Sequence, residues 1–387
     1  MDRANLPPDF ALLQVTPRLD GGGVEAITLD VALAMAAAGY RSFVASQGGA
    51  LEGSWAGGGA ELVRLPVHSR NPLRMAVNAA RLTSLVRREA ISLIHVRSRA
   101  PAFSALWAAR LTRTPVVATY HGIYSAKSPL KRWYNGVMTR GDLVIANSEF
   151  TRRHILEQHP IDPSRVVIVP EGIDTDRFDA AGVSADRVAT LRRAWGLEVK
   201  PSATVILQAA RLTEWKGQRV MIEALSKLGG SREIVLVLAG RPETERALAG
   251  LRAAAASAGL QGKVRFVGAV HDMPAAYLVA DLVVAPSIAP ESFGRGVAEA
   301  CAMGRPVLAS RLGATAETVA DGQTGWLVAP GDGAAWASAI KAALDMPPEA
   351  RRTMGVRART RMTRLYSLTA MCEATFALYR QVIDARR

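Results

Sequence analysis

Short runs of apolar residues recur along the whole chain, separated by longer segments of mixed character. In the first half the runs fall at 10–15, 42–45, 93–96, 115–119, 143–146 and 166–169. In the second half they fall at 204–208, 234–238, 264–267, 282–285 and 307–309. Expected helices lie between them, for example at 25–38, 71–88, 102–111 and 149–158. Strands that alternate with helices predict an α/β fold with parallel sheets covered by helices, here in two doubly wound domains.

A polar stretch separates the two halves of this pattern. The chain has 387 residues, which is enough for two domains of ordinary size. After 170–174, an Asp- and Arg-rich stretch continues until Lys200. We therefore predict an N-terminal domain at 1–180 and a second domain at 195–364. The segment 365–387 carries apolar residues at helical spacing and is predicted to be a closing helix.

Membrane-spanning and secreted classes are not expected. No window holds the ~20 apolar residues that span a bilayer. Residues 1–8 lack a basic flank followed by an apolar core, so no signal peptide is expected. Cys301 and Cys372 have no paired spacing, which favours buried apolar thiols in a reducing compartment over disulfides or a cysteine-bound metal. The predicted location is therefore cytoplasmic.

The charge of the chain is strongly positive. The formal net charge is +14, and residues 351–387 contain nine arginines against Glu373 and Asp384. Such an excess suits nucleic acid, an anionic membrane or an acidic substrate. No helix-turn-helix, zinc-finger or RNA-binding aromatic pattern accompanies it, so nucleic acid is not an expected partner. A solvated face without a partner remains the alternative for the C-terminal arginines.

Two glutamates separated by seven residues, Glu291 and Glu299, stand at the start of a predicted helix. Glu291 lies on the loop after the run at 282–285, and Glu299 lies on the helix that this loop opens. Gly294 and Gly296 leave backbone N–H groups open to a ligand, and a helix start attracts an anion. A ligand with phosphate in the middle and hydroxyls on both sides, such as a nucleotide sugar, suits this arrangement. Two solvated glutamates on an ordinary strand–loop–helix unit are the alternative.

The residues around this pair resemble the signature of the family 4 glycosyltransferases, which are retaining enzymes of GT-B fold. The similarity covers Phe293, Gly294, Glu299 and the segments 304–307, 313–317 and 321–328. It implies GT-B architecture, with two Rossmann-like domains that face each other across a cleft. The acceptor would bind on the N-terminal side and the nucleotide-sugar donor on the C-terminal side. The resemblance also implies that the closing helix crosses back to the N-terminal domain.

Arg211 and Lys216 follow the run at 204–208 and resemble the Arg–Lys motif of the same family. Two fixed cations beside a departing pyrophosphate stabilise the charge that develops as the sugar bond breaks, which lowers the barrier. The resemblance therefore implies that both residues are catalytic and bind the donor. With two such cations a divalent ion is unnecessary, so we predict neither a metal nor another cofactor. A pair of exposed loop cations is the alternative.

The resemblance also assigns roles on the glutamate loop. Glu291 is expected to hold sugar hydroxyls as a catalytic residue and Glu299 the ribose hydroxyls, while amides around Phe293 and Gly294 meet the sugar or phosphate. The favoured mechanism is front-side attack, in which the leaving phosphate oxygen takes the acceptor proton, because the family has no well-placed carboxylate nucleophile. The family often has Gly-Asp-Gly where this chain has 240–242, so the nucleotide base stays open.

Three candidate features of the first half follow predicted strands, and ligands of such sheets gather beyond the carboxyl ends of strands. The turn after 10–15 contains Gly22 and Gly23, which by resemblance face the donor diphosphate; a flexible turn is the alternative. Glu25 on the next helix is an acceptor-side candidate. His121 resembles the family's catalytic-domain histidine, which implies contact with the donor sugar, whereas a lone structural histidine is the alternative.

Two further segments, 147–148 and 170–174, also follow predicted strands. Both resemble segments that line the cleft in the family. Their individual side chains are interpreted as helix caps and turn residues.

Cations gather near aromatic rings in the first half. Trp133 and Tyr134 lie beside basic residues, and a second basic segment starts at Arg70. Such mixed surfaces suit an anionic membrane, so we predict a phosphorylated or acidic glycolipid acceptor. Envelope glycan assembly, with lipopolysaccharide first, at the inner face of the cytoplasmic membrane is the predicted setting. A solvated face over a core stripe is the alternative. The predicted acceptor-side residues, besides Glu25, are Arg97, Arg99, Lys127, Lys131 and Arg132.

Two other function classes fit the same fold. One is a different enzyme, such as a sugar-nucleotide epimerase or a phosphorylase, although neither signature is visible. The other is a non-catalytic module that binds a nucleotide sugar. The complete set of candidate catalytic and donor-binding residues argues against a module that has lost its catalytic activity: His121, Arg211, Lys216, Glu291 and Glu299. The sequence therefore predicts a retaining, metal-independent glycosyltransferase.

Overall fold

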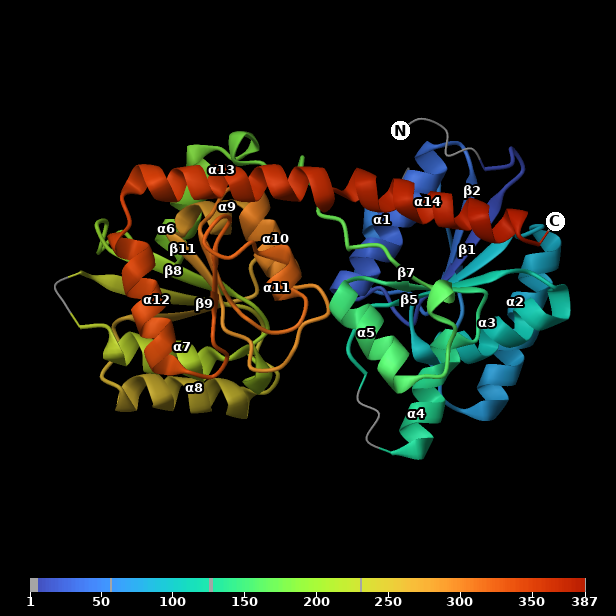
Figure 1. Ribbon diagram of the computed structural model, residues 1–387, viewed down its shortest axis with the longest axis horizontal. Coiled ribbons are helices and arrows are strands. Elements are labelled where there is room, and N and C mark those ends of the chain that lie inside the picture. Colours follow the sequence, from blue (N-terminus) through green and yellow to red (C-terminus); the bar gives the residue numbers. More distant parts are fainter. Residues whose placement is uncertain (1–5, 56–57, 125–127, 230–231, 387) are drawn as a thin grey trace. The chain divides into compact units, whose positions relative to one another are not determined.

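The computed structural model describes residues 6–55, 58–124, 128–229 and 232–386. The chain divides into two compact units (Figure 1). The first unit runs to Gly172 and resumes at Leu368, and the second comprises Ile173–Ser367. Each unit is built on a parallel sheet with helices on both faces, so the predicted α/β class with two doubly wound domains is confirmed.

In the described part of the first unit, seven parallel strands pair in the order β3-β2-β1-β4-β5-β6-β7. The strands are β1 (Ala11–Val15), β2 (Arg41–Ser46), β3 (Glu61–Arg64), β4 (Leu93–Val96), β5 (Val116–Tyr120), β6 (Leu143–Ala146) and β7 (Val166–Ile168). The α-helices are α1 (Gly23–Ala37), α2 (Pro72–Arg88), α3 (Arg99–Thr112), α4 (Pro129–Asn135), α5 (Glu149–Gln158) and α14 (Leu368–Asp384). Short 3₁₀ turns are η1 (Ala50–Trp55), η2 (Gly136–Thr139) and η3 (Pro163–Arg165).

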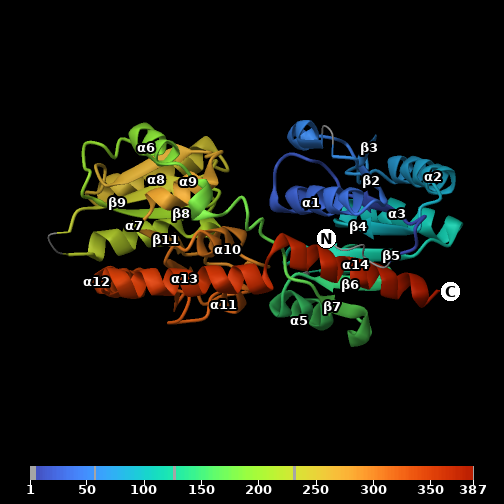
Figure 2. The same ribbon diagram turned by 90° about the horizontal axis from the view of Figure 1, so that it is seen from above.

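The strands of the first sheet bury side chains on both faces. Along β1, Leu13 and Val15 pack with α2 and α3, whereas Leu12 packs with α1 and α14. Both pictures show α2 and α3 side by side (Figures 1 and 2). A strand that is covered on both faces needs apolar side chains at successive positions, which explains the uninterrupted apolar runs.

In the described part of the second unit, six parallel strands pair in the order β10-β9-β8-β11-β12-β13. The strands are β8 (Thr204–Ala209), β9 (Ile234–Ala239), β10 (Val264–Gly268), β11 (Leu282–Ala285), β12 (Val307–Ser310) and β13 (Trp326–Val328). The α-helices are α6 (Ala185–Ala194), α7 (Gln218–Lys227), α8 (Glu245–Ser257), α9 (Met273–Val279), α10 (Arg295–Ala302), α11 (Thr315–Thr318), α12 (Gly333–Asp345) and α13 (Pro348–Leu365). Two 3₁₀ turns are η4 (Ala180–Gly182) and η5 (Glu214–Lys216).

Two layers of helices enclose the second sheet (Figure 1). Helices α7, α8 and α12 cover one face, where Trp336 is fully buried. Helices α9, α10 and α13 cover the other face, where Cys301 is buried. Cys372 is buried in the first unit between α14 and the sheet. The prediction of two buried thiols is therefore confirmed.

Side-chain caps fix several helix starts that lead out of strand-end loops. Asn71 Oδ1 accepts from the backbone N–H of Leu73 at 2.9 Å and so begins α2. Ser148 Oγ accepts from Thr151 N at 3.0 Å and begins α5, which confirms its predicted capping role. Each cap satisfies a backbone donor that the helix itself cannot satisfy.

The structure differs from the sequence-based expectation at the sheet edges and at the end of the chain. The strands β3 and β13 were not expected, because each is short, lies at a sheet edge and has no fully buried run of side chains. The closing helix starts at Leu368 rather than at 365, because α13 runs to Leu365 and its C-cap residue Tyr366 has a φ of −133°. None of the helices in the described ranges combines the length and apolar character that crossing a bilayer requires.

Candidate active site

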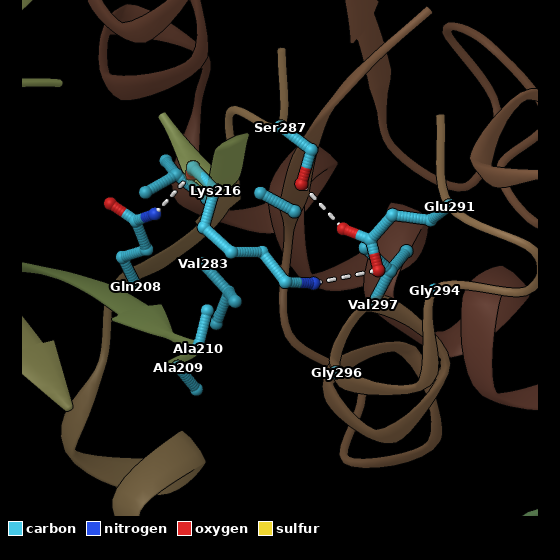
Figure 3. A pocket seen from close by; sticks show the side chains of 12 residues that line it. Gln208, Ala209, Ala210, Lys216, Val283, Ser287, Glu291, Gly294, Gly296 and Val297 are labelled. Atoms are coloured by element: carbon cyan, nitrogen blue, oxygen red, sulfur yellow. Dashed lines mark hydrogen bonds and ion pairs between the residues drawn. The ribbon is translucent and has the colours of Figure 1, made fainter. Parts of the chain in front are cut away.

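A pocket opens at the carboxyl edge of the second sheet, between β8 and β11. These two strands are neighbours, but the chain continues from β8 to β9 on one side and from β11 to β12 on the other. This is the switch point of the sheet, the place where the loops of a doubly wound fold part and leave room for a ligand. The pocket is lined by residues of both strand ends, of the loop after β11 and of the start of α10 (Figure 3).

Lys216 and Glu291 meet inside this pocket. Lys216 Nζ lies 2.8 Å from Glu291 Oε2, and Ser287 Oγ donates to Glu291 Oε1 at 2.5 Å. The two side chains are only 17% and 13% exposed, so their charges interact more strongly than those of a surface pair. Gln208 Nε2 donates to the Lys216 carbonyl at 2.7 Å, which fixes the backbone at the same place. Figure 3 shows the lysine reaching across to the glutamate.

Two glycines allow the backbone to come close at this site. Gly217 has φ of 74° between η5 and α7, and a Cβ there would lie 1.9 Å from the Pro286 carbonyl oxygen. Gly294 has φ of 86° at the start of α10, and a Cβ there would lie 2.8 Å from Thr315 Cγ2. Both positions therefore require glycine. Gly294, Gly296 and Val297 at the start of this eight-residue helix line the pocket, and a helix start favours negative charge.

Glu299 lies on α10 with both carboxylate oxygens engaged. Arg295 Nε donates to Oε1 at 3.0 Å, and Tyr277 Oη donates to Oε2 at 3.0 Å. Tyr277 also donates to the Gly296 carbonyl at 3.2 Å. Burial, and then the nearby Glu299 carboxylate, raises the pKa of Tyr277 well above its usual value, so the phenol remains a donor. Tyr277 of α9 thus fixes the orientation of the carboxylate.

Arg211 and Phe293 lie apart from the Lys216–Glu291 pair. Arg211 follows β8 and is exposed, and its backbone carbonyl accepts from Gln218 Nε2 at 2.9 Å. Phe293 is buried, with its ring 5.7 Å from that of Tyr366. The structure therefore brings together Lys216, Glu291 and the glycine loop, leaves the Arg211 side chain in solvent, and uses the Phe293 side chain in the core.

The first sheet has its own switch point, between β1 and β4. Arg97 follows β4 and is buried, with Nε donating to Gln14 Oε1 on β1 at 3.0 Å and Nη2 donating to the same atom at 2.5 Å. Arg97 was predicted as an acceptor-side residue, and the structure buries its side chain at the edge of the sheet. Gln14 Nε2 in turn donates to the Thr28 carbonyl of α1 at 2.9 Å.

His121 lies at the carboxyl end of β5 among buried polar side chains. Its Nδ1 lies 3.3 Å from Glu171 Oε1, which also accepts from Asn147 Nδ2 at 2.9 Å. Burial lowers the pKa of His121 below its usual value, the Glu171 carboxylate opposes this shift, and Arg97 adds to it. Glu25 also raises the pKa of His121, which places its carboxylate within electrostatic range of the ring.

The glycine turn after β1 lies beside Glu25. Gly22 is the N-cap residue of α1, and a Cβ at Gly22 would lie 2.4 Å from Glu25 Oε2, so the carboxylate folds back over the turn. Gly22 and Gly23 are both exposed. The predicted N-terminal features are therefore gathered at one edge of the first sheet: the glycine turn, Glu25 and His121.

The remaining acceptor-side residues are spread over another part of the first unit. Arg99 Nη1 donates to Asn135 Oδ1 at 2.8 Å, and its guanidinium lies 3.9 Å from the centre of the Tyr124 ring. Lys131 and Arg132 are exposed on α4. Lys127 lies outside the described residues. The basic helix α2 buries its apolar stripe, including Leu82, Leu85 and Val86, in the core, as the alternative interpretation stated.

Several residues of these sites were not predicted from the sequence. Ser287 holds Glu291, and Tyr277 holds Glu299. In the first unit Gln14 holds Arg97, and Glu171 holds His121. Gln14 and Glu171 lie at or next to strand ends, a position that could have marked them. Tyr277 has no such signal, because its helix reaches the site only through the packing of α9 on α10.

The described ranges contain no group of three or more His, Cys, Asp or Glu side chains that could hold a metal ion. Asp174, part of the Asp-x-Asp sequence near the unit boundary, accepts from the backbone N–H groups of Asp176 and Arg177. Its carboxylate therefore shapes a turn. Independence from metal stays a prediction.

The chain is similar to known proteins in both halves. Residues 21–177 match the family described as "Glycosyltransferase Family 4", and residues 193–361 match "Glycosyl transferases group 1". A "D-inositol 3-phosphate glycosyltransferase" of Mycobacterium sp. (strain KMS) is 34% identical over 224 residues, which are 57% of this chain and 48% of the relative. The match thus spans about half the length of that curated relative.

Two solved structures resemble nearly the whole chain. A glycosyltransferase from Rickettsia africae is 29% identical with a TM-score of 0.89, covering 97% of this chain and 98% of that one. Anabaena Alr3699/HepE, solved in complex with UDP and glucose, is 22% identical with a TM-score of 0.83, covering 97% of this chain and 99% of that one. The second likeness concerns the fold alone. Together with the two family matches, these similarities show that the chain belongs to the group 1 glycosyltransferases, with an N-terminal half of the family 4 type and the GT-B fold.

Proposed function

We propose that the protein is a retaining glycosyltransferase that moves a sugar from a nucleotide-diphosphate sugar to a glycan or glycolipid acceptor. The observation that carries the proposal is the Lys216–Glu291 pair in the pocket at the β8/β11 switch point, next to the start of α10. A cation, a carboxylate and a helix start in one pocket match the three parts of such a donor: phosphate, sugar hydroxyls and a second phosphate.

In this proposal the diphosphate takes the place of Glu291 as the partner of Lys216. The ammonium group then stabilises the leaving phosphate, whose negative charge grows as the sugar bond breaks. Glu291, oriented by Ser287, accepts hydrogen bonds from sugar hydroxyls. Arg211 is exposed on the same segment after β8 as Lys216 and supplies the second cation when its side chain turns toward the phosphates. The UDP and glucose of the Anabaena structure support a uridine-diphosphate sugar as the first donor to test.

Retention of configuration and independence from metal are part of the proposal. The reaction is expected to follow front-side attack, with the leaving phosphate oxygen accepting the proton of the acceptor hydroxyl. Lys216, Arg211 and the start of α10 would offset the charge that a divalent ion offsets in other transferases. His121 is expected to contact the donor sugar from the edge of the first sheet.

An anionic acceptor is favoured, with a lipopolysaccharide-type glycolipid first. The support is two exposed leucines of the first unit, Leu73 on α2 (79%) and Leu130 on α4 (75%), each next to an exposed arginine or lysine. Exposed leucines among cations suit an anionic membrane surface, so a peripheral position at the inner face of the cytoplasmic membrane is included in the proposal. A phosphorylated polyol is the second candidate acceptor, favoured by the similarity to the D-inositol 3-phosphate glycosyltransferase.

A donor screen tests the central proposal. Purified protein is incubated with UDP-, GDP- and ADP-sugars, with and without each acceptor, and release of the nucleoside diphosphate is measured. The expected result is release from one donor class that Lys216→Ala lowers roughly 10²- to 10³-fold. Product anomers are assigned by NMR, and the same assay in a chelator tests independence from metal. Isomerised donor without release would favour the epimerase, and binding without turnover would favour the binding module; either result would overturn the transferase.

A further inference from the structure

Three neighbouring strands of the first sheet end in polar side chains that contact one another. His121 follows β5, Asn147 follows β6, and Glu171 comes shortly after β7. Glu171 Oε1 is the shared atom: it lies 3.3 Å from His121 Nδ1 and 2.9 Å from Asn147 Nδ2. The side chains of His121 and Glu171 are only 3% and 10% exposed. Contacts buried to this extent fix side-chain orientation more firmly than surface contacts do.

The orientation of the Asn147 amide follows from its other contacts. Ser148 Oγ donates to Thr151 Oγ1 at 2.9 Å, and Thr151 Oγ1 donates to Asn147 Oδ1 at 2.8 Å. The oxygen of the amide is therefore the end that faces Thr151, which leaves the NH₂ group to donate to Glu171 Oε1. Glu171 is thus an acceptor at the atom that His121 approaches.

The charges around the ring favour a neutral imidazole. Burial and Arg97 both lower the pKa of His121, while Glu171 and Glu25 raise it, and the result lies below the usual value. His95 is a further titratable neighbour, and its own pKa is held well below the usual value by burial. Arg97 also interacts electrostatically with Glu171, so the buried cation already offsets the carboxylate when the ring is uncharged. A neutral imidazole has one N–H donor and one acceptor nitrogen.

We infer that Glu171 is a positioning residue that holds His121 as the neutral tautomer protonated at Nδ1. The carboxylate oxygen can only accept, so the ring nitrogen beside it must donate. Nε2 is then the acceptor nitrogen of the ring, and a hydroxyl of a bound sugar is the chemical group suited to it. The effect of Glu171 on catalysis rests on the proposed transferase function, whereas the tautomer itself does not.

The tautomer is measured without any substrate. Long-range ¹H–¹⁵N spectra of protein labelled at its six histidines show which ring nitrogen carries the proton, and His121→Asn identifies the signals of His121. The wild-type protein is expected to show His121 protonated at Nδ1. Glu171→Leu removes the acceptor at similar volume, and the signal of the Nδ1-protonated form should be lost or reduced. Asp162→Asn is the matched control, because Asp162 caps the short turn at Pro163–Arg165 in the same unit.

Glu171→Gln is the second variant, and it keeps the protein testable if the leucine variant does not fold. Asn147 Nδ2 still needs an acceptor, so the glutamine oxygen should occupy the same place and keep the proton on Nδ1. Removing the negative charge should lower the pH at which the ring takes up a second proton, seen as a shift of the His121 titration curve. Protonation of wild-type His121 at Nε2, or an unchanged ring signal in Glu171→Leu, would overturn the inference.

Turnover separates positioning from a merely structural role. If the proposed function is correct, Glu171→Leu should lower kcat roughly 10- to 100-fold with little change in donor affinity, and Glu171→Gln should recover most of the loss. A changed tautomer in a protein without transferase activity would leave the inference standing and refute the proposed function. A changed tautomer with unchanged kcat in an active enzyme would refute the catalytic part of the inference.

Discussion

Lys216 Nζ lies 2.8 Å from Glu291 Oε2, so the cation of the phosphate motif and the first glutamate of the loop neutralise each other. The lysine closes the loop that follows β8, and the glutamate lies on the loop that follows β11. The two strands at the switch point thus contribute one charge each. A diphosphate that enters the pocket would compete with the carboxylate for the ammonium group, and the released carboxylate would become available to hydroxyls.

The first prediction concerns the free energy of unfolding. Lys216→Met or Glu291→Gln alone leaves the remaining, mostly buried charge without its ionic partner, so each should destabilise the second unit. The double variant should lose less than the sum, with an interaction energy of roughly 0.5–3 kcal/mol. Urea denaturation of the four proteins at neutral pH measures the cycle.

Lys341→Met with Asp345→Asn is a suitable control cycle, because this pair lies on the surface of α12 with side chains 70% and 48% exposed. An exposed pair of this type should give an interaction energy near zero. Equal interaction energies in the two cycles would contradict the view that the Lys216–Glu291 contact is strengthened by burial.

The second prediction concerns Tyr277, which holds Glu299. Tyr277→Phe removes the donor to Glu299 Oε2 and to the Gly296 carbonyl and keeps the ring in the core. Loss of a buried hydrogen bond should destabilise the protein by about 1 kcal/mol. Donor affinity should fall with kcat little changed, because Glu299 is expected to bind the ribose. Glu299→Ala should weaken donor binding more strongly, and calorimetry with the identified donor measures both.

Tyr366→Phe serves as the control for Tyr277→Phe. Tyr366 Oη donates to the Glu317 carbonyl at 3.2 Å, so its removal should affect stability in a similar way. Donor affinity should stay at the wild-type value. If Tyr277→Phe binds the donor as tightly as the wild type, Tyr277 does not position Glu299 for the ligand.

The positions of the candidate residues along the strands were predictable. Apolar runs mark the strands, and the polar residue after each run lies at the carboxyl edge of a parallel sheet. His121, Glu291 and the glycine turn could be placed in this way. Both switch points follow from the strand order, which depends on long-range pairing that the runs do not encode. The pocket between β8 and β11 was therefore not located by the sequence alone.

Side-chain direction accounts for most of what was missed. Arg97 and Arg99 are two residues apart, yet the first points into the sheet edge toward Gln14 and the second stacks on Tyr124. A charge count cannot distinguish them, because a fully buried arginine and a partly buried one look the same in a sequence. Tyr277 acts through a contact with a residue more than twenty positions away, which no local pattern reveals. Glu171 lies in the segment 170–174, whose place after a strand was predicted, but its contact with Asn147 was not.

The third prediction is a loss of stability in mild acid. Burial holds the pKa of His95 well below its usual value, where its ring lies 2.5 Å from Tyr379 Oη and 2.7 Å from Thr119 Oγ1. As the pH falls below about 6.5, the unfolded chain takes up a proton at this position that the folded protein does not. The free energy of unfolding should then fall by up to about 1.4 kcal/mol per pH unit for this residue.

Urea midpoints between pH 8 and pH 5 test this slope. His121 and His159 are shifted in the same direction by burial and add to it. His95→Gln should reduce the slope by the contribution of that one residue. A constant midpoint over this range would contradict the assignment of neutral buried rings.

The fourth prediction concerns membrane binding by the first unit. The protein should bind vesicles that contain anionic lipid at low salt and dissociate at physiological salt, because the Debye length falls from about 30 Å at 0.01 M to about 8 Å at 0.15 M. The double variant Leu130→Ala/Lys131→Ala removes an exposed leucine (75%) and its neighbouring cation on α4, and it should bind severalfold more weakly in a sedimentation assay.

Val356→Ala/Arg357→Ala is the matched control in the second unit, since Val356 is 56% exposed on α13 next to an exposed arginine. This variant should bind vesicles like the wild type. Equal losses in both variants would mean that the net charge of +14, rather than the surface around α4, drives adsorption. Absence of binding to anionic vesicles at low salt would contradict the peripheral location.

The fifth prediction uses the two thiols as separate reporters of the two units. Cys372 on α14 belongs to the first unit and Cys301 on α10 to the second, and burial raises the pKa of each thiol to about 12. Since the thiolate is the reactive form, neither should react with a thiol reagent in the folded protein at pH 8. Labelling should require opening of the surrounding helices. Cys301→Ser keeps only the Cys372 thiol and reports the opening of the first unit, whereas Cys372→Ser keeps only the Cys301 thiol and reports the opening of the second. In rising urea, the unit that opens first should be labelled first. Stoichiometric labelling of either variant within the mixing time, without denaturant, would show that its thiol is not buried as described.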